Sequence, residues 1–157
     1  MVQENRYEKL GISRTDNIVI DALINAKYIY AQKNGIHFDV QINVPIQLPF
    51  ENADISILLG NILDNAFEAS IQLPVSERFV ELLMRLENNT LCIALKNRYN
   101  GFVVRDKNGN MLTTKGDAQN HGIGLKSVYR ITNKYHGSIV IDDSVNMFTV
   151  KIMLCDI

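Results

Sequence analysis

The clearest hydrophobic pattern in the chain is a helical repeat over residues 52–73. Apolar side chains recur there at steps of three and four residues, which places them along one face of a helix. They are Ile55, Leu58, Leu59, Ile62, Leu63, Ala66, Phe67 and Ile71. Pro74 cannot continue a helix and sets its end. We therefore expect this helix to pack on a core along its whole length.

Two further helices are expected, one on either side of the first. One begins at Asp16 or Asn17, because either side chain can cap the free backbone N–H groups of a first helical turn. It ends at Asn34-Gly35, where glycine accepts the left-handed conformation common after helices. The other is expected from Gly122 to about Tyr135.

Five segments are expected to form strands, the first because apolar and polar residues alternate along it. They span residues 36–44, 78–87, 91–97, 138–141 and 147–154. The second and third are joined by Asn88-Asn89, residues that suit a tight antiparallel hairpin. This order predicts an α/β fold, a two-layer α/β sandwich in which the helices cover one face of a mixed, largely antiparallel sheet.

Two stretches lack any such pattern. Residues 1–16 are polar and irregular, and are interpreted as the end of something upstream. Residues 98–121 carry three glycines and many polar side chains, so they are expected to form a long loop inside a compact domain. Loops of that length are usually functional or disordered.

The composition is typical of one soluble globular domain. The 157 residues are 46% hydrophobic, and 16 Lys and Arg nearly balance 17 Asp and Glu, for a formal net charge of -1. Without a basic patch, nucleic acid is not an expected partner. No apolar run reaches the roughly 18 residues of a membrane span, and no signal peptide is found. The two cysteines and three histidines predict neither a disulfide framework nor a histidine-rich metal site.

Polar residues fill the other face of the 52–73 helix. They are Asp54, Asn61, Asp64, Asn65 and Glu68. Asn61 and Asn65 lie one turn apart, and each carries a small helical cost because its amide competes with backbone hydrogen bonds. An amide oxygen is also a hard neutral ligand for Mg²⁺, which takes other ligands from water and substrate phosphates. The pair is either an ordinary exposed face, which the spacing alone favours, or part of a magnesium site.

Asn97 falls on the same sheet face as Leu91, Ile93 and Leu95, the expected core side. A buried amide needs hydrogen-bond partners. Asparagine offers both a donor and an acceptor, so it could read the edge of a heterocycle such as adenine. The alternative, of at least equal weight, is a strand-ending asparagine that bonds its own loop.

The motif His121-Gly-Ile-Gly-Leu125 follows the long loop and opens the last expected helix. Glycines at a helix start let backbone N–H groups and the helix dipole meet a phosphate closely. Lys115 and His121 flank the glycines and could close over a polyphosphate. The plainer alternatives are a tight turn for the glycines and a solvated charge for Lys115.

These motifs, taken together and in order, resemble those of the ATP-binding domain of sensor histidine kinases. They are Asn61-Ile-Leu-Asp-Asn65-Ala66, Asn97, Thr113-Thr-Lys115 and His121-Gly-Ile-Gly-Leu125. Such domains belong to the superfamily of gyrase, chaperone, histidine kinase and MutL ATPases. The best match within it is to the kinases of peptide quorum-sensing systems. The resemblance runs from about Asn17 to the C-terminus and implies the Bergerat-type ATP-binding fold.

The resemblance implies a role for each motif. Asn65 becomes the Mg²⁺ ligand, and Asn61 supports the phosphates or the metal. Asn97 takes the position that reads adenine, and residues 98–121 become the ATP lid. The other residues expected at the nucleotide are Gly101, Lys115, His121, Gly122, Ile123, Gly124 and Leu125.

Two departures from the superfamily pattern matter. Where Asp-x-Gly-x-Gly is usual, this chain has Asn97-Arg-Tyr-Asn-Gly101, so an amide replaces the adenine-reading carboxylate and only the second glycine remains. Chaperone and gyrase relatives carry a glutamate general base at the position of Asn61, and an amide cannot accept that proton. The chain is therefore expected to hold the γ-phosphate for another nucleophile rather than to hydrolyse ATP efficiently.

The acceptor in this family is a histidine on a separate helical dimerisation domain. His37 and His136 are interpreted as structural or surface histidines and His121 as a nucleotide contact, so the acceptor is absent from this chain. We thus expect the catalytic domain of a two-component sensor histidine kinase, unable to autophosphorylate alone. Residues 1–16 would be the end of the upstream dimerisation helix or an added tail, and residues 17–157 the ATP-binding domain.

The whole protein implied by the resemblance is a membrane-anchored homodimer. This domain would lie in the cytoplasm, and the phosphate would pass to a response regulator. Two alternatives remain. One is a serine protein kinase of the anti-sigma-factor type, complete at this length, and the other is a docking module whose nucleotide site is degenerate.

Overall fold

A computed structural model of the chain describes residues 15–101, 104–105, 111–112 and 118–156, and of residues 104–105, 111–112 and 118–124 it describes the backbone alone. Its helices are α2 Ile18–Lys33, α3 Asn52–Ile71 and α4 Ala118–Lys134, with a short 3-10 helix η1 at Val75–Glu77. The strands of its main sheet are β1 His37–Asn43, β2 Phe79–Glu87, β3 Thr90–Arg98, β6 Ser138–Asp142 and β7 Met147–Cys155.

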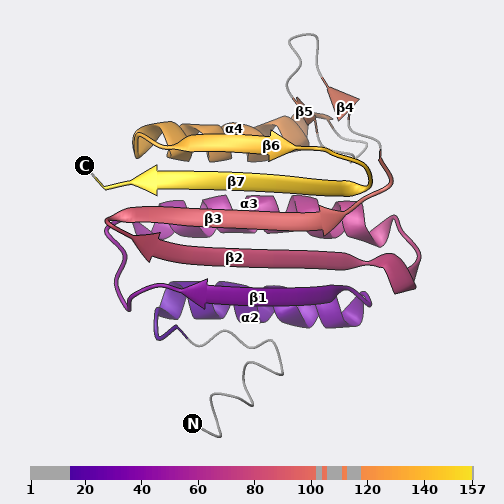
Figure 1. Cartoon of the computed structure of the whole chain (residues 1–157), viewed down its shortest axis with the longest axis horizontal. Coiled ribbons are helices and arrows are strands. Elements are labelled where there is room, and N and C mark those ends of the chain that lie inside the picture. Colours follow the sequence, from indigo (N-terminus) through magenta and orange to yellow (C-terminus); the bar gives the residue numbers. More distant parts are fainter. Residues whose placement is uncertain (1–14, 102–103, 106–110, 113–117, 157) are drawn as a thin grey trace, which may run out of the picture.

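The fold has two layers, with α2, α3 and α4 on one face of a five-stranded sheet (Figure 1). The strand order is β1-β2-β3-β7-β6. Strands β1 and β2 are parallel, joined by a crossover through α3, and the other neighbouring pairs are antiparallel. This confirms the predicted two-layer α/β sandwich with a mixed, largely antiparallel sheet. Within the described part of the chain, no helix is both long and apolar enough to cross a bilayer.

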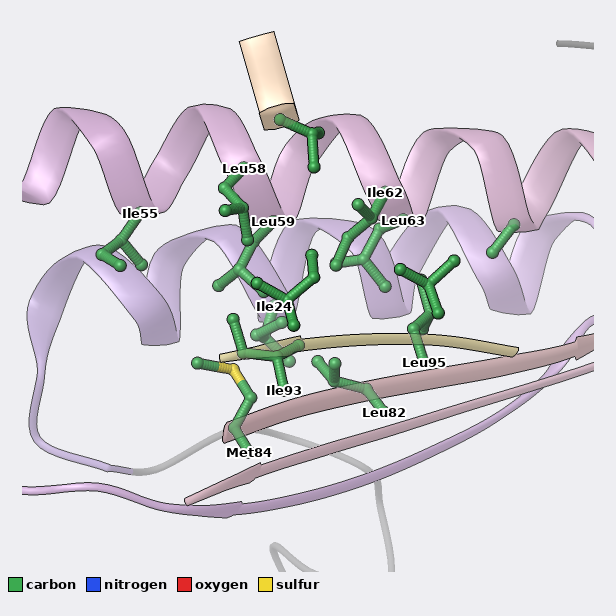
Figure 2. Packing of buried hydrophobic residues seen from close by; sticks show 14 of the residues in the cluster. Ile24, Ile55, Leu58, Leu59, Ile62, Leu63, Leu82, Met84, Ile93 and Leu95 are labelled. Carbon is green, nitrogen blue, oxygen red and sulfur yellow. The ribbon is translucent and has the colours of Figure 1, made fainter. Parts of the chain in front are cut away.

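The core lies between α3 and the middle of the sheet (Figure 2). The predicted apolar stripe of α3 is buried except at Ile71, which is half-buried. Burial of this stripe fixes the rotation of α3 about its own axis, and so fixes where its polar residues point. The partners of this stripe include Ile24 of the neighbouring helix α2 and, in the sheet, Leu82 and Met84 of β2 and Ile93 and Leu95 of β3 (Figure 2).

Local signals place the ends of the first helix and the first hairpin. Of the two predicted caps of α2, Asp16 and Asn17, the structure uses Asn17, whose side-chain oxygen accepts a hydrogen bond from the Ile20 N–H at 3.2 Å. Gly35, after the helix, has a φ of 63°, the left-handed conformation predicted for it. The Asn88-Asn89 turn has φ values of 51° and 61°, as expected for a tight hairpin.

The start of α4 differs from the prediction. The helix begins at Ala118 rather than Gly122, so four residues expected in the loop are helical. A glycine after a polar stretch predicts a helix start, but the residue types upstream also decide it. Ala118 and Gln119 are good helix formers, so the helix extends toward the N-terminus past the glycine.

Two short strands lie in the connection between β3 and α4. Within the predicted loop 98–121, Val104–Arg105 (β4) pairs antiparallel with Met111–Leu112 (β5). Arg98 belongs to β3 and is not part of the loop. The loop prediction was therefore too long at both ends and missed this small hairpin.

Candidate functional site

Asn61 and Asn65 both lie half-buried on α3, and the rotation of the helix shows which neighbour they face. At about 100° per residue, Asp54, Asn61 and Asn65 point within roughly 20° of one direction. The Nζ of Lys134, on α4, donates to Asp54 Oδ2 at 2.8 Å. This direction is therefore the α4 side, and both amides face α4.

Asp64 faces α2, the other helix beside α3. The Nζ of Lys27 on α2 donates to Asp64 Oδ1 at 2.5 Å. This carboxylate therefore joins α3 to α2 and is not grouped with the two asparagines. The sequence predicts one polar face for α3, whereas the structure divides it between two neighbouring helices.

Asp54 is a buried charge at the contact between α3 and α4, with 6% of its surface exposed. Hydrogen bonds from Lys134 Nζ and then from the Tyr135 hydroxyl hold the pKa of Asp54 below its usual value, against the opposing effect of burial. Burial, followed by the hydrogen bond to Asp54, raises the pKa of Tyr135. At neutral pH an ionised Asp54 thus accepts bonds from an ammonium and a neutral phenol, and it is engaged in holding α4.

Asn97 is buried on the core face of the sheet, as predicted, with 2% of its surface exposed. Its Nδ2 donates to the backbone carbonyl of Arg98 at 3.0 Å. The core-side position and the local hydrogen bond occur together, so the two interpretations of this residue are compatible. An amide nitrogen carries two hydrogens, and this bond uses one of them.

The chain directly after β3 is held on both sides. Tyr99 is buried, and its hydroxyl donates to the Asp143 carbonyl at 2.7 Å. The backbone N–H of Tyr99 donates to the Asn146 carbonyl at 3.2 Å. Both acceptors lie between β6 and β7. On the other side, Asn100 Nδ2 donates to Gln72 Oε1, just past α3, at 3.1 Å. The end of β3 is thus fastened to two other parts of the domain.

Sequence reasoning missed Tyr99 as a structural residue. The signal that could have found it is a large aromatic residue where the superfamily pattern has its first glycine. Gly101, the surviving second glycine, has a φ of 84°, which favours glycine. The fastened stretch runs through Asn100, so a lid would begin no earlier than Gly101, three residues after the predicted start at 98.

The glycine motif lies inside α4 rather than at its start, where it was predicted. Gly122 is the fifth residue of the helix, and the helical backbone continues through Ile123, Gly124 and Leu125. Glycine still lets another group approach the helix backbone closely, because no side chain is in the way. Leu125 is half-buried. Lys115 and the side chain of His121, the two expected cations, lie outside the described parts of the chain.

The two helices run side by side and antiparallel (Figure 1). Because each helical residue rises about 1.5 Å, Gly124, ten residues before Lys134, lies roughly level with Asp64, ten residues after Asp54. Asn65 faces α4 at this level. Asn65 is thus roughly level with the glycine-bearing turns, and Asn61 lies about one helical turn nearer the start of α3. The start of α4 lies on the same side of the domain as the end of β3 (Figure 1).

The donor set at this place suits Mg²⁺ that arrives with a phosphate. Across the described ranges, no group of three or more His, Cys, Asp or Glu side chains is placed to hold a metal. Asn65 can supply one hard neutral oxygen, and Mg²⁺ commonly takes one or two protein ligands and the rest from water and substrate phosphates. The residues fit a magnesium ion held partly by a nucleotide.

A protein-family model described as GHKL domain matches residues 50–155, which is more than half of the chain. The matched segment includes the amide pair of α3, Asn97 and the glycine motif of α4. No curated protein sequence matches the chain significantly.

Solved structures share the fold over most of the chain. The catalytic domain of histidine kinase ThkA, in a nucleotide-free form, has a TM-score of 0.67 and 14% identity over 90% of this chain and 92% of that one. A mycobacterial sensor histidine kinase, MprB, has a TM-score of 0.63 and 18% identity over 87% of this chain and 91% of that one. The Acinetobacter baumannii histidine kinase AdeS has a TM-score of 0.62 and 13% identity over 98% of this chain and 76% of that one. At these identities the likeness shows the fold alone, and it agrees with the architecture predicted from the sequence.

Proposed function

The chain belongs to the GHKL domain family, and from this we propose that it is the ATP-binding catalytic domain of a sensor histidine kinase. One observation carries the proposal. Asn61 and Asn65 lie on the face of α3 that points to α4, the helix of the glycine motif, and Asn97 lies on the core side of β3, which packs against α3. A metal, a polyphosphate and a base could be contacted together at this place by three different elements.

The proposed roles follow the chemistry of each group. Asn65 contributes an amide oxygen to Mg²⁺, and Asn61 supports the phosphates or the metal. Asn97 reads the adenine edge through its amide. The bound ion would neutralise phosphate charge. The remaining proposed contacts are Gly101 at the start of the lid, the cations Lys115 and His121, and the segment Gly122, Ile123, Gly124 and Leu125 at the phosphates.

The arrangement favours phosphoryl transfer to an acceptor over hydrolysis of ATP. Asn61 cannot act as a general base, because an amide does not accept a proton near neutral pH. The nearby Asp64 is paired with Lys27, and Asp54 is buried in hydrogen bonds to α4. Transfer depends mainly on positioning and charge neutralisation, so the acceptor must be delivered in line with the γ-phosphate.

The proposed acceptor is a histidine on another domain of the same protein. His37 lies on β1, 3.1 Å from Asp39, and stacks on Phe79. His136 follows α4 with a φ of 52°. Neither lies on a helix that could present it to a second copy. The whole protein would then be a membrane-anchored homodimer with a dimerisation domain, a response regulator downstream and a place in the quorum-sensing branch.

The test is magnesium-dependent ATP binding measured by calorimetry. We expect Asn65→Ala to weaken Mg²⁺-ATP binding by about 10- to 100-fold, since losing a hydrogen bond or ligand to a charged group costs about 1.5–3 kcal/mol. The matched control is Asn133→Ala, which removes an exposed asparagine from α4 and should leave the affinity unchanged.

Other results would favour other functions. Equal affinities in the wild type and Asn65→Ala would contradict the assignment of Asn65. A wild-type protein whose melting temperature does not move with millimolar Mg²⁺-ATP would favour the docking module. Phosphate transfer to a serine of a protein partner, without any added domain, would favour the anti-sigma-factor type of kinase. The three solved structures named above are histidine kinases, which supports the histidine acceptor.

A further inference from the structure

The first turn of α3 and the end of α4 are joined by a compact polar cluster, here named the α3–α4 clasp, made of Glu51, Asp54, Lys134 and Tyr135. Asp54 Oδ2 accepts hydrogen bonds from Lys134 Nζ at 2.8 Å and from the Tyr135 hydroxyl at 2.6 Å. The Glu51 N–H donates to the Tyr135 hydroxyl oxygen at 3.1 Å. Lys134 Nζ also lies 3.4 Å from Glu51 Oε1. The Asp54 carboxylate therefore accepts hydrogen bonds from the last residue of α4 and from the residue directly after it.

The clasp is set into the fold and is not a loose surface pair. The Asp54 side chain is 9% exposed. The Tyr135 ring packs edge-on against Phe50, with ring centroids 5.0 Å apart. The acidic group lies in the first turn of α3 and Lys134 in the last turn of α4, where each charge also suits the helix dipole.

The directional hydrogen bonds of the clasp fix the position of α4 along α3, which apolar packing alone leaves adjustable. Val128 and Ile131 of α4 are fully buried, but hydrophobic contacts are non-directional and tolerate sliding of one helix along another. Charge-assisted hydrogen bonds are short, and their geometry is directional. The clasp therefore sets how far α4 sits along α3. A slip of one residue would move the glycine-bearing turns by about 1.5 Å and turn them by about 100°.

Building on the proposed function, we propose that Asp54 is a positioning residue for the nucleotide site. It holds α4 at the axial position that brings the backbone of residues 122–124 level with the Asn65 amide. Its action is specific to the phosphate end of the ligand, because Asn97, which would read the base, is carried by β3 and not by α4.

The experiment separates positioning from plain stabilisation with a matched ion pair. Asp54→Asn removes the charge of the clasp at nearly constant shape. Lys27→Met breaks a different carboxylate pair of α3, Lys27 to Asp64, which leads to α2 and not to α4. Calorimetry and NMR titration give the affinities for Mg²⁺-ATP and for adenosine at a temperature where each variant is fully folded.

We expect Asp54→Asn to bind Mg²⁺-ATP about tenfold more weakly, a loss typical of residues that orient the groups in contact with a ligand. It should bind adenosine as the wild type does. Lys27→Met should lower the melting temperature and leave both affinities within about twofold. Tyr135→Phe removes one hydrogen bond of the clasp and should show the same split to a smaller degree, which keeps the test available if Asp54→Asn does not fold.

Three results would overturn the inference. The first is wild-type affinity for Mg²⁺-ATP in Asp54→Asn, or in Tyr135→Phe if only that variant folds. The second is an equal loss for Mg²⁺-ATP and adenosine, which indicates general loosening of the domain. The third is an equal loss in Lys27→Met. A wild-type protein that does not bind Mg²⁺-ATP would contradict the proposed function itself, and this inference with it.

Discussion

Gly137 and Gly60 differ in the space around their Cα atoms, and this difference gives a prediction for alanine at each. A Cβ at Gly137 would overlap the Met153 carbonyl oxygen and lie 3.2 Å from the Thr132 carbonyl oxygen. A Cβ at Gly60, inside α3, would meet nothing within 4 Å. Gly137→Ala should therefore lower the free energy of unfolding by about 2–3 kcal/mol. Gly60→Ala should raise it by about 0.5–1 kcal/mol, because alanine is the better helix former.

Urea denaturation of the two variants and the wild type gives both values. The prediction fails if Gly137→Ala unfolds at the wild-type urea concentration, or if Gly60→Ala is the less stable of the two.

At the residue scale, the sequence shows which polar side chains α3 carries, but it does not show which residues they contact. It predicts Asn61 and Asn65 as one pair on a helix face, because a pair four residues apart is a local matter. It cannot separate them from Asp54 and Asp64, whose partners lie 80 and 37 residues away in other helices. Only the packing of the helices shows that these aspartates are structural, so the polar face of α3 looks uniform in the sequence.

At the scale of elements, the α3–α4 clasp predicts a pH dependence of stability. The hydrogen bond from Lys134, followed by that from Tyr135, lowers the pKa of Asp54 from its usual value of 3.8. A carboxyl whose pKa is lower in the folded than in the unfolded protein stabilises the fold above the unfolded pKa. This contribution is lost as the pH falls through the folded pKa. The stability difference between the wild type and Asp54→Asn should therefore be constant from pH 7 to 5 and shrink toward pH 2.

Urea midpoints of both proteins at pH 7, 5, 3 and 2 measure this difference. A difference that stays constant down to pH 2 would show that the charge of Asp54 does not contribute to holding the helices together. Lys27→Met in the same series reports on the carboxylate pair that leads to α2.

The helices and strands were predictable because their signals are local. The buried stripe of α3 and the caps at Asn17 and Gly35 all follow from residue types a few positions apart. The predicted start of α4 is wrong, because Ala118 and Gln119 favour the helix strongly enough to extend it past Gly122 toward the N-terminus. The fastening of Tyr99 to the turn between β6 and β7 joins segments 44 residues apart, and no local pattern reports such a contact.

At the scale of the whole molecule, helices cover one face of the sheet, and in the described part of the chain no element covers the other face, here called the open face. Two adjacent residues of β2 test this asymmetry. Leu82 points to the core and has no exposed surface, whereas Leu83 points to the open face and is 37% exposed. Leu82→Ala should lower the free energy of unfolding by about 2–5 kcal/mol through the cavity it leaves. Leu83→Ala should lower it by less than about 1 kcal/mol.

Thermal unfolding of the two variants measures the difference. Equal losses would mean that the open face is covered by something, for example a second copy of the chain. A dependence of the Leu83→Ala melting temperature on protein concentration would then identify self-association.

The class of fold was predictable and the order of the strands was not. Helices and strands in this succession predict two layers with the helices together on one face. The strand order β1-β2-β3-β7-β6 depends on which distant strands pair, and above all on β3 beside β7. Such pairing is decided by how the whole core fills, because the strands of the sheet have similar apolar faces.

The pairing of β3 with β7 has a consequence for the segment between them. Arg98 and Met147 are directly opposite, so residues 99–146 form one closed excursion between two bonded strands. The conformational entropy lost on closing a chain segment grows only with the logarithm of its length, at about 0.6 kcal/mol for each doubling. By this term alone, doubling the length of the segment between Arg98 and Met147 would cost only about 0.6 kcal/mol of folding free energy. The paired strands β3 and β7 hold both ends of the segment in the sheet, whatever its length.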